Sequence, residues 1–158
     1  MLQKTPALTA APRSVFVYGV LCFDSILLAL LKRVPNKIPH RVDGYLARTI
    51  QLEEFAPFPV LLAAPEQSVD GFILHDLTAP ELLVLDRYET GEHNYYDRVT
   101  LFTHQGCNID YYQPTPRLLN DGSLGEPWVP QTHQDSYAKT YIADVISAFF
   151  DSNPDLPR

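Results

Sequence analysis

One stretch of the chain, residues 82–99 (LLVLDRYETGEHNYYDRV), places a carboxylate at the end of an apolar helical stripe. Leu82, Leu85 and Glu89 fall at i, i+3 and i+7, so a helix carries all three side chains on one face. Glu89 would then point inward at the helix C-terminus, where burial and the helix dipole both raise the pKa of a carboxyl group. A carboxylate with a pKa nearer neutrality can act as a general base. On periodicity alone the competing interpretation is favoured, in which the helix frays at Tyr88 and Glu89 points to solvent.

A second candidate site follows a short apolar segment near the start of the chain, residues 14–18 (SVFVY). Gly19 comes next and allows the backbone to turn tightly and a ligand to approach closely. The helix expected beyond it begins with unpaired N–H groups and a partial positive charge, which can hold an anion or an oxyanion. The loop of residues 18–23 is therefore a candidate cradle of backbone donors. Considered alone, a structural turn is the favoured explanation, because one glycine is a weaker signal than a Gly-rich phosphate motif.

The other chemically capable residues give weaker signals. The five histidines are scattered without HxxxH or HxH spacing, which argues against a metal site. Cys22 lies on the loop, but no histidine is near it in sequence, so a buried thiol is favoured over a nucleophile. Arg98 could hold a substrate carboxylate through a bidentate contact, although an exposed strand arginine is the commoner case. We expect Tyr95 and Tyr96 to pack in a sheet, and Trp128 to clamp a proline-rich loop onto the body of the domain.

Strands and helices in the first half of the chain must position the loop. Residues 14–18 are typical of a strand buried on both faces. Asp24 is a plausible N-cap for a core helix over residues 25–33. Residues 40–52 predict one bent or edge strand around a glycine. Two further strands are expected over residues 60–63 and 68–75, and Gly71 in the second of these indicates a bulge or a close approach of another group.

The second half of the chain begins with a clear helix signal. Thr78 and Glu81 form a capping box, and Gly91 ends the helix that follows. A hairpin is expected next, and then a long loop that covers a site or is disordered, before a final helix with a core stripe of Tyr137, Tyr141, Val145 and Phe149. The expected ranges are residues 95–103 and 108–113 for the hairpin strands, 114–131 for the loop and 135–150 for the helix.

Composition sets the broad class. The 158 residues are 46% hydrophobic and 20% charged, which favours one globular domain over residues 13–150, with a flexible arm over 1–12 and a tail over 151–158. The net charge of −7, with no basic block longer than Lys32-Arg33, argues against a nucleic-acid or membrane partner. Asp24 interrupts the apolar run that a signal peptide or membrane span would need. Two cysteines indicate free thiols in a reducing, cytoplasmic location.

Taken in order, four segments resemble the gamma-glutamylcyclotransferase-like family: VFVYGVL, the Phe58-Pro59 pair, VDGFILHDL and LDRYETGEHNYYDRV. The LLKRVP run after the loop is most similar to the avirulence-induced-gene-2-like (AIG2-like) branch of that family. The YGxL pattern is short, but its pairing with LDxYE later in the chain makes the likeness specific. The resemblance covers about residues 14–113.

The resemblance implies a mixed α+β fold, a small curved β-barrel with flanking helices and a pocket at one end of the barrel. It implies Glu89 as proton acceptor and a small-molecule γ-glutamyl substrate, whose own α-amino group attacks its γ-carbonyl to release 5-oxoproline and an amine or amino acid. No cofactor and no metal are implied. The substrate-binding loop implied by the family consists of Tyr18, Gly19, Val20, Leu21, Cys22 and Phe23.

One residue departs from the family pattern. Val20 stands where the family usually has Thr or Ser, so a hydroxyl is missing while the backbone donors remain. Two alternatives therefore stay open: a non-catalytic small-molecule-binding or stress-response domain, and a γ-glutamyl acyltransferase or amide hydrolase. The sequence indicates neither the leaving group nor the oligomeric state.

Overall fold

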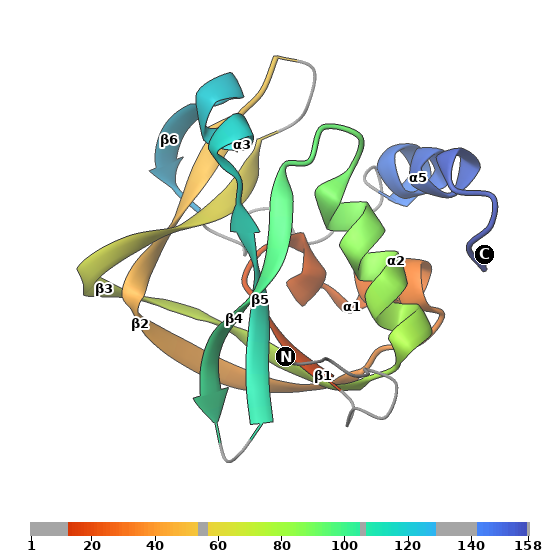
Figure 1. Ribbon diagram of the computed structural model, residues 1–158, viewed down its shortest axis with the longest axis horizontal. Coiled ribbons are helices and arrows are strands. Elements are labelled where there is room, and N and C mark those ends of the chain that lie inside the picture. Colours follow the sequence, from red (N-terminus) through yellow and green to blue (C-terminus); the bar gives the residue numbers. More distant parts are fainter. Residues whose placement is uncertain (1–12, 54–56, 105–106, 129–141, 158) are drawn as a thin grey trace, which may run out of the picture.

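The computed structural model describes residues 13–53, 57–104, 107–128 and 142–157. Its centre is a curved six-stranded sheet in the order β4-β5-β1-β3-β2-β6 (Figure 1). Neighbouring strands are antiparallel, apart from the parallel pair β1 and β5. The strands are β1 (Arg13–Val17), β2 (Asn36–Gln51), β3 (Phe58–Leu77), β4 (Tyr96–His104), β5 (Cys107–Pro114) and β6 (Ser123–Pro127).

The mixed α+β class is confirmed, but the sheet does not close into a barrel. Its order begins at β4 and ends at β6, and within the described ranges these two strands do not pair with each other. β6 is a short, exposed strand that pairs only with the last part of β2. The expected barrel is therefore corrected to a strongly curved, open sheet.

Helices cover one face of this sheet. In Figure 1, α1, α2 and α5 lie together on one side of the molecule, while α3 and β6 lie at the far end of the sheet. Side chains of β1 alternate between two apolar clusters: Val15 and Val17 join the larger one with the helices, and Phe16 joins the smaller one on the opposite face. β1 is thus buried on both faces, as predicted. The helical segments are η2 (Val20–Cys22), α1 (Asp24–Leu31), α2 (Ala79–Thr90), α3 (Pro116–Asp121), η4 (Ile142–Ile146) and α5 (Ser147–Ser152).

Strands β2 and β3 form a long two-stranded ribbon. The expectation of separate strands over residues 60–63 and 68–75 is wrong, because β3 runs without a break from Phe58 to Leu77. The predicted interruption corresponds to a bulge: residues 64–67 fall between the partners of Asp43 and Tyr45, opposite Gly44, whose φ is 87°. β2 is bent there, as predicted, but it is not an edge strand, since β3 and β6 flank it.

Gly71 of β3 marks a close approach, as the sequence suggests. A Cβ atom there would lie 2.2 Å from the carbonyl oxygen of Val17 on the paired strand β1. Any side chain would therefore push the two strands apart at the point where β1 ends and the candidate loop begins.

The sequence predicts the ends of α2 correctly but not the start of α1. The capping box of Thr78 and Glu81 is present, and α2 ends at Gly91 with φ 64°. Asp24 is not the N-cap of α1 but its first residue; Phe23 occupies the cap position, and the Asp24 carboxylate pairs with Lys37 at 2.7 Å instead.

The C-terminal third differs most from expectation. The segment 114–131 was expected to be a loop, yet it contains α3 and β6 within its described part. The final helix was expected over residues 135–150. In the structure, residues 142–146 are π-helical and α5 continues the helix to Ser152. Tyr137 and Tyr141 of the expected stripe lie outside the described residues. Val145 is 43% exposed and does not belong to the core stripe.

Leu156, in the expected tail, is buried in the main cluster, and the expected arm over 1–12 lies outside the described residues. Across the described ranges, no helix has the length and apolar content needed to cross a membrane.

Candidate active site

A cavity of about 60 Å³ opens where β1 ends, and it brings together the two regions that the sequence singled out. Aromatic and aliphatic side chains make up most of its wall. Glu89 is the one charged side chain among the described residues that line it. The wall consists of Phe16 and Val17 of β1, loop residues 18–21, Phe58 and Pro59 of β3, Tyr88 and Glu89 of α2, Tyr96 of β4 and Tyr112 of β5.

The loop after β1 lines this cavity and forms a tight turn. Its tight turn is held by hydrogen bonds from the Cys22 N–H to the Gly19 carbonyl, 3.0 Å, and from the Phe23 N–H to the Val20 carbonyl, 3.1 Å. The N–H groups of Val20 and Leu21 stand at the start of this turn and have no acceptor inside it. They are therefore available to hold an oxygen atom with developing negative charge.

Glycine at position 19 is required by its neighbour. A Cβ atom on Gly19 would lie 2.5 Å from Cγ of Pro59, which is closer than real side chains approach. Pro59 is held in turn by Tyr96, whose hydroxyl donates to the Pro59 carbonyl oxygen at 2.8 Å. The sequence predicted that this glycine lets a ligand approach, whereas the close neighbour in the structure is Pro59, which fixes the loop against β3.

Four of the six loop residues predicted to bind substrate line the cavity, and two do not. Tyr18, Gly19, Val20 and Leu21 form part of its wall, whereas Cys22 and Phe23 lie outside it. Burial raises the pKa of the Cys22 thiol to about 12, and its Sγ contacts the Val17 carbonyl oxygen at 3.5 Å. The residue is only partly buried, but the raised pKa fits the unreactive thiol that the sequence favoured.

Glu89 lies in the last turn of α2 and points into the cavity, so the interpretation in which it faces solvent is wrong. Removal from water raises the pKa of its carboxyl group from 4.5 to about 8. Its carboxylate makes no hydrogen bond or ion pair with any described residue. Burial raises the pKa of Tyr18, with the negative charge of Glu89 as the next largest cause, and both residues line the cavity.

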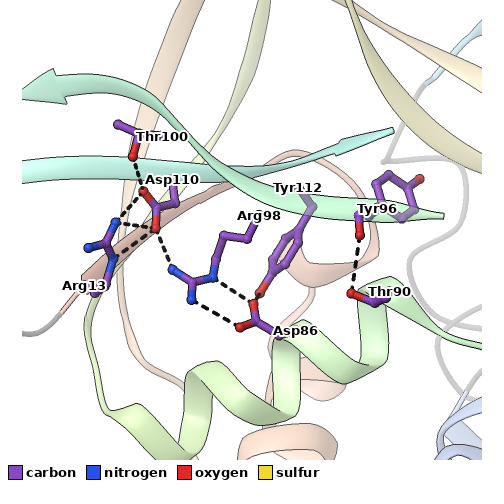
Figure 2. A network of polar contacts seen from close by, with 8 residues as sticks. All are labelled: Arg13, Asp86, Thr90, Tyr96, Arg98, Thr100, Asp110 and Tyr112. Atoms are coloured by element: carbon purple, nitrogen blue, oxygen red, sulfur yellow. Dashed lines mark hydrogen bonds and ion pairs between the residues drawn. The ribbon is translucent and has the colours of Figure 1, made fainter. Parts of the chain in front are cut away.

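A network of charged side chains anchors α2 to the sheet beside Glu89 (Figure 2). Asp86, one turn earlier on the helix, accepts hydrogen bonds from Nε of Arg98 at 2.7 Å and Nη2 at 3.1 Å. The Tyr112 hydroxyl also donates to Asp86, at 2.8 Å. At the helix end, the Thr90 hydroxyl donates to the carbonyl oxygen of Tyr96 at 3.3 Å. These contacts fix the position of the turn that carries Glu89.

The network continues to a second aspartate in the sheet. Asp110, whose side chain is 3% exposed, accepts from Nη1 of Arg98 at 2.7 Å and from Nη2 of Arg13 at 2.7 Å. Thr100 donates to its other oxygen at 3.1 Å. Both sequence interpretations of Arg98 are therefore wrong: it is neither an exposed strand residue nor a free clamp for a substrate carboxylate, because two aspartates already engage it.

Sequence reasoning did not identify Asp86, Asp110 or Tyr112, and it assigned Tyr96 to sheet packing alone. One signal was available, since Asp86 lies three residues before Glu89 and so shares its side of the helix. The other residues come together only through the pairing of β4 with β5 and of β5 with β1. Among the described residues, no group of three or more His, Cys, Asp or Glu side chains is arranged to hold a metal ion.

Comparison with known proteins agrees with this geometry. A sequence model of the family described as gamma-glutamyl cyclotransferase, AIG2-like, matches residues 15–129, which include both β1 with its loop and the end of α2. The chain belongs to this family. Its match also contains β4 and β5, and so Asp86 with its partners Arg98 and Tyr112.

Two curated relatives match part of the chain. AIG2-like protein D of Arabidopsis thaliana is 32% identical over 85 residues, which are 54% of this chain and 54% of that protein. A gamma-glutamylcyclotransferase of Methanocaldococcus jannaschii is 33% identical over 104 residues, 63% of this chain and 44% of that protein. The chain thus spans about half the length of the curated relatives it matches.

Solved structures share the fold at lower identity. A solution structure from Arabidopsis thaliana superposes with a TM-score of 0.55 at 19% identity, covering 92% of this chain and 90% of that one. A structure of a gamma-glutamyl cyclotransferase superposes with a TM-score of 0.54 at 14% identity, covering 89% and 79%. At these identities the likeness concerns the fold alone.

Proposed function

We propose that this chain converts a γ-glutamyl compound to 5-oxoproline with release of an amine or amino acid, and that Glu89 is its general acid and base. Membership of the gamma-glutamyl cyclotransferase family supports the reaction class. The observation that carries the role of Glu89 is its place as the one charged side chain in the described wall of an otherwise aromatic and aliphatic cavity, beside the backbone donors of the loop.

The raised pKa of Glu89 suits the first proton transfer. The attacking α-amino group arrives as an ammonium, whose pKa is about 8 at a peptide N-terminus and higher beside the free α-carboxylate of a γ-glutamyl group. Because removal from water raises the pKa of Glu89 to about 8, the ionised form of Glu89 takes this proton at a lower cost in free energy than an exposed glutamate would. The neutral amine then attacks the γ-carbonyl carbon of the same molecule and forms the new ring C–N bond.

The loop supplies the second part of the reaction. As the ring closes, the carbonyl oxygen takes on negative charge, which the free N–H groups of Val20 and Leu21 can stabilise. The bond between the γ-carbon and the leaving nitrogen then breaks, and Glu89 returns its proton to that nitrogen. Attack within one molecule needs no nucleophilic side chain, and folding the substrate into its cyclising conformation supplies much of the rate. Substitution of the family hydroxyl by Val20 leaves these backbone donors in place.

The test is release of 5-oxoproline from a panel of γ-glutamyl amines, γ-glutamyl amino acids and glutathione, with wild type beside Glu89→Gln. We expect release by wild type and a fall of at least about 100-fold in the glutamine variant, in line with loss of a general base. Glu81→Gln, at the other end of the same helix and outside the described wall of the cavity, is the matched control. Release by folded Glu89→Gln at the wild-type rate would exclude Glu89 as the base.

Two other outcomes identify the competing functions. Release of free glutamate, or formation of a new amide, in place of 5-oxoproline would indicate a hydrolase or an acyltransferase. Thermal stabilisation by a γ-glutamyl compound without turnover would indicate a binding domain that retains the cavity.

A further inference from the structure

Two carboxylates on α2 lie three residues apart and have opposite surroundings. Asp86 accepts three hydrogen bonds, from two nitrogen atoms of Arg98 and from the Tyr112 hydroxyl (Figure 2). Glu89 accepts none from any described residue, although it lines the cavity. The polar donors of this region are thus directed to the carboxylate that does not line the cavity.

The two donors that Asp86 engages lie next to the cavity. Tyr112 is part of its wall. Nε of Arg98 and the Tyr112 hydroxyl both bond to the same oxygen, Oδ1 of Asp86, at 2.7 Å and 2.8 Å, so the guanidinium adjoins that hydroxyl. Tyr112 and Glu89 line the same cavity. Burial, then the charge and the hydrogen bond of Asp86, then the charge of Glu89 raise the pKa of Tyr112.

We propose that Asp86 is a positioning residue of the candidate active site: by engaging Arg98 and Tyr112, it keeps both donors turned away from Glu89, whose carboxylate stays without a protein partner and ready for the substrate ammonium. This inference rests on the proposed function of Glu89. It assigns Asp86 a role that acts through Glu89 and involves no contact with substrate.

The other groups around Glu89 do not replace these donors. Tyr18 faces it from the loop, but its hydroxyl contacts the Tyr112 carbonyl oxygen at 3.5 Å. The Tyr96 hydroxyl from β4 is engaged by the carbonyl oxygen of Pro59. Tyr88 completes the titratable residues in the described wall, and no cation belongs to it. A guanidinium or hydroxyl released from Asp86 would therefore be a new partner for Glu89, and it would favour the ionised carboxylate.

The experiment is a titration of the Glu89 carboxyl group by NMR on protein labelled with ¹³C at the glutamate carboxyl, with Glu89→Gln used to assign its signal. Asp86→Asn removes the charge and one of the two acceptor oxygens, which weakens the hold on Tyr112 and on Nε and Nη2 of Arg98, while Nη1 stays with Asp110. We expect the Glu89 titration midpoint to fall by about 1–3 pH units, the effect of a nearby cation or donor on a carboxyl group. Asp110→Asn is the matched control, because it makes the same change on the far side of Arg98 and leaves the contacts of Asp86 intact. We expect it to move the midpoint by less than half as much.

An unchanged midpoint in folded Asp86→Asn, or equal shifts in the two variants, would overturn the proposal. Where Asp86→Asn alone does not fold, the charge-balanced pair Asp86→Asn with Arg98→Met takes its place. In this pair Tyr112 is the donor whose contact with residue 86 is weakened, so we expect the Glu89 midpoint to fall below the wild-type value. Adding Tyr112→Phe to the pair should return the midpoint toward that value. A midpoint in the pair equal to that of wild type would again overturn the proposal.

The titration separates this inference from the proposed function because it requires no turnover. With an active enzyme, the pH at which kcat/KM reaches half its plateau should fall in Asp86→Asn together with the NMR midpoint. A fall in the midpoint without any 5-oxoproline release in wild type would support the role of Asp86 in holding the two donors and reject the catalytic role of Glu89. Activity with an unmoved midpoint would reject the role of Asp86 alone.

Discussion

The buried carboxyl group of Glu89 makes a specific prediction about stability and pH. Its pKa is about 8 in the folded protein, against 4.5 for an exposed glutamate. Between these values the folded chain keeps a proton that the unfolded chain has released. The unfolded state then binds fewer protons, so the free energy of unfolding falls as the pH rises. This contribution is present in full below about pH 4.5 and is lost as the pH rises through about 8.

The perturbation is Glu89→Gln, which fills nearly the same volume and cannot ionise. Each pH unit in this window corresponds to about 1.4 kcal/mol, so the full shift corresponds to about 5 kcal/mol. This value is a ceiling, because a side chain in the last turn of α2 can turn toward water once it is charged. We therefore expect Glu89→Gln to gain about 2–5 kcal/mol of stability relative to wild type between pH 5 and pH 8.5.

The assay is urea unfolding of both proteins at several pH values, followed by the fluorescence of Trp128, the single tryptophan, which is buried. Other titrating groups are common to both proteins and cancel in the difference. Glu81→Gln is the control. The hydrogen bond from Arg33 is the main cause that lowers the pKa of Glu81, so this carboxyl group titrates below pH 4.5. The difference in unfolding free energy between Glu81→Gln and wild type should therefore stay constant from pH 5 to 8.5. Parallel curves for wild type and Glu89→Gln would refute the assigned burial of Glu89.

Three further changes have expected outcomes. Gly19→Ala places a Cβ atom 2.5 Å from Cγ of Pro59; we expect a loss of about 1–3 kcal/mol in urea unfolding together with slower 5-oxoproline release, and unchanged values would contradict the tight fit of the loop. Thr78→Ala removes the capping box with Glu81 and should cost about 1 kcal/mol in the same unfolding measurement, while a neutral result would mean that this helix end is stabilised otherwise. Cys22→Ala should change the 5-oxoproline rate by less than about twofold, because burial raises the pKa of this thiol to about 12 and holds it in its weakly nucleophilic form; a loss of activity in the folded variant would assign the thiol a chemical role.

Local signals in the sequence predicted the parts of the fold that depend on neighbours in the chain. The start of α2 follows from Thr78 and Glu81, which satisfy each other's backbone groups within one turn. The inward direction of Glu89 follows from helical periodicity once the helix is known to reach it. One local signal was missed: Thr115 followed by Pro116 caps α3, with the Thr115 hydroxyl accepting from the Leu118 N–H at 3.3 Å, inside a segment expected to be a loop.

Long-range pairing accounts for what the sequence could not predict. Arg13 and Asp110 are 97 positions apart and meet because β1 and β5 pair in parallel, an arrangement that no local pattern encodes. Arg98 reaches both Asp86 and Asp110 only once α2 packs beside β4 and β5. Whether the sheet closes likewise depends on the relative positions of β4 and β6, which the folding of the whole chain determines.

The contrast between Asp86 and Glu89 explains why the fold tolerates an unpartnered buried carboxyl group. A buried charge without a partner is unfavourable, and a protein usually avoids it by pairing the group or by keeping it protonated. Here Arg98 and Tyr112 would be suitable partners for Glu89, yet they are engaged one helical turn away by Asp86. Arg98 remains ionised: burial would lower its pKa, but its hydrogen bonds to Asp86 and Asp110 more than offset this effect. Glu89 therefore keeps its proton near neutral pH, and the strongest electrostatic partner it can acquire is a cation brought in from outside. An α-ammonium group is such a cation: in the cavity it favours the ionised carboxylate, whose proton leaves to solvent. Glu89 then accepts the ammonium proton and returns to the neutral form that the cavity favours.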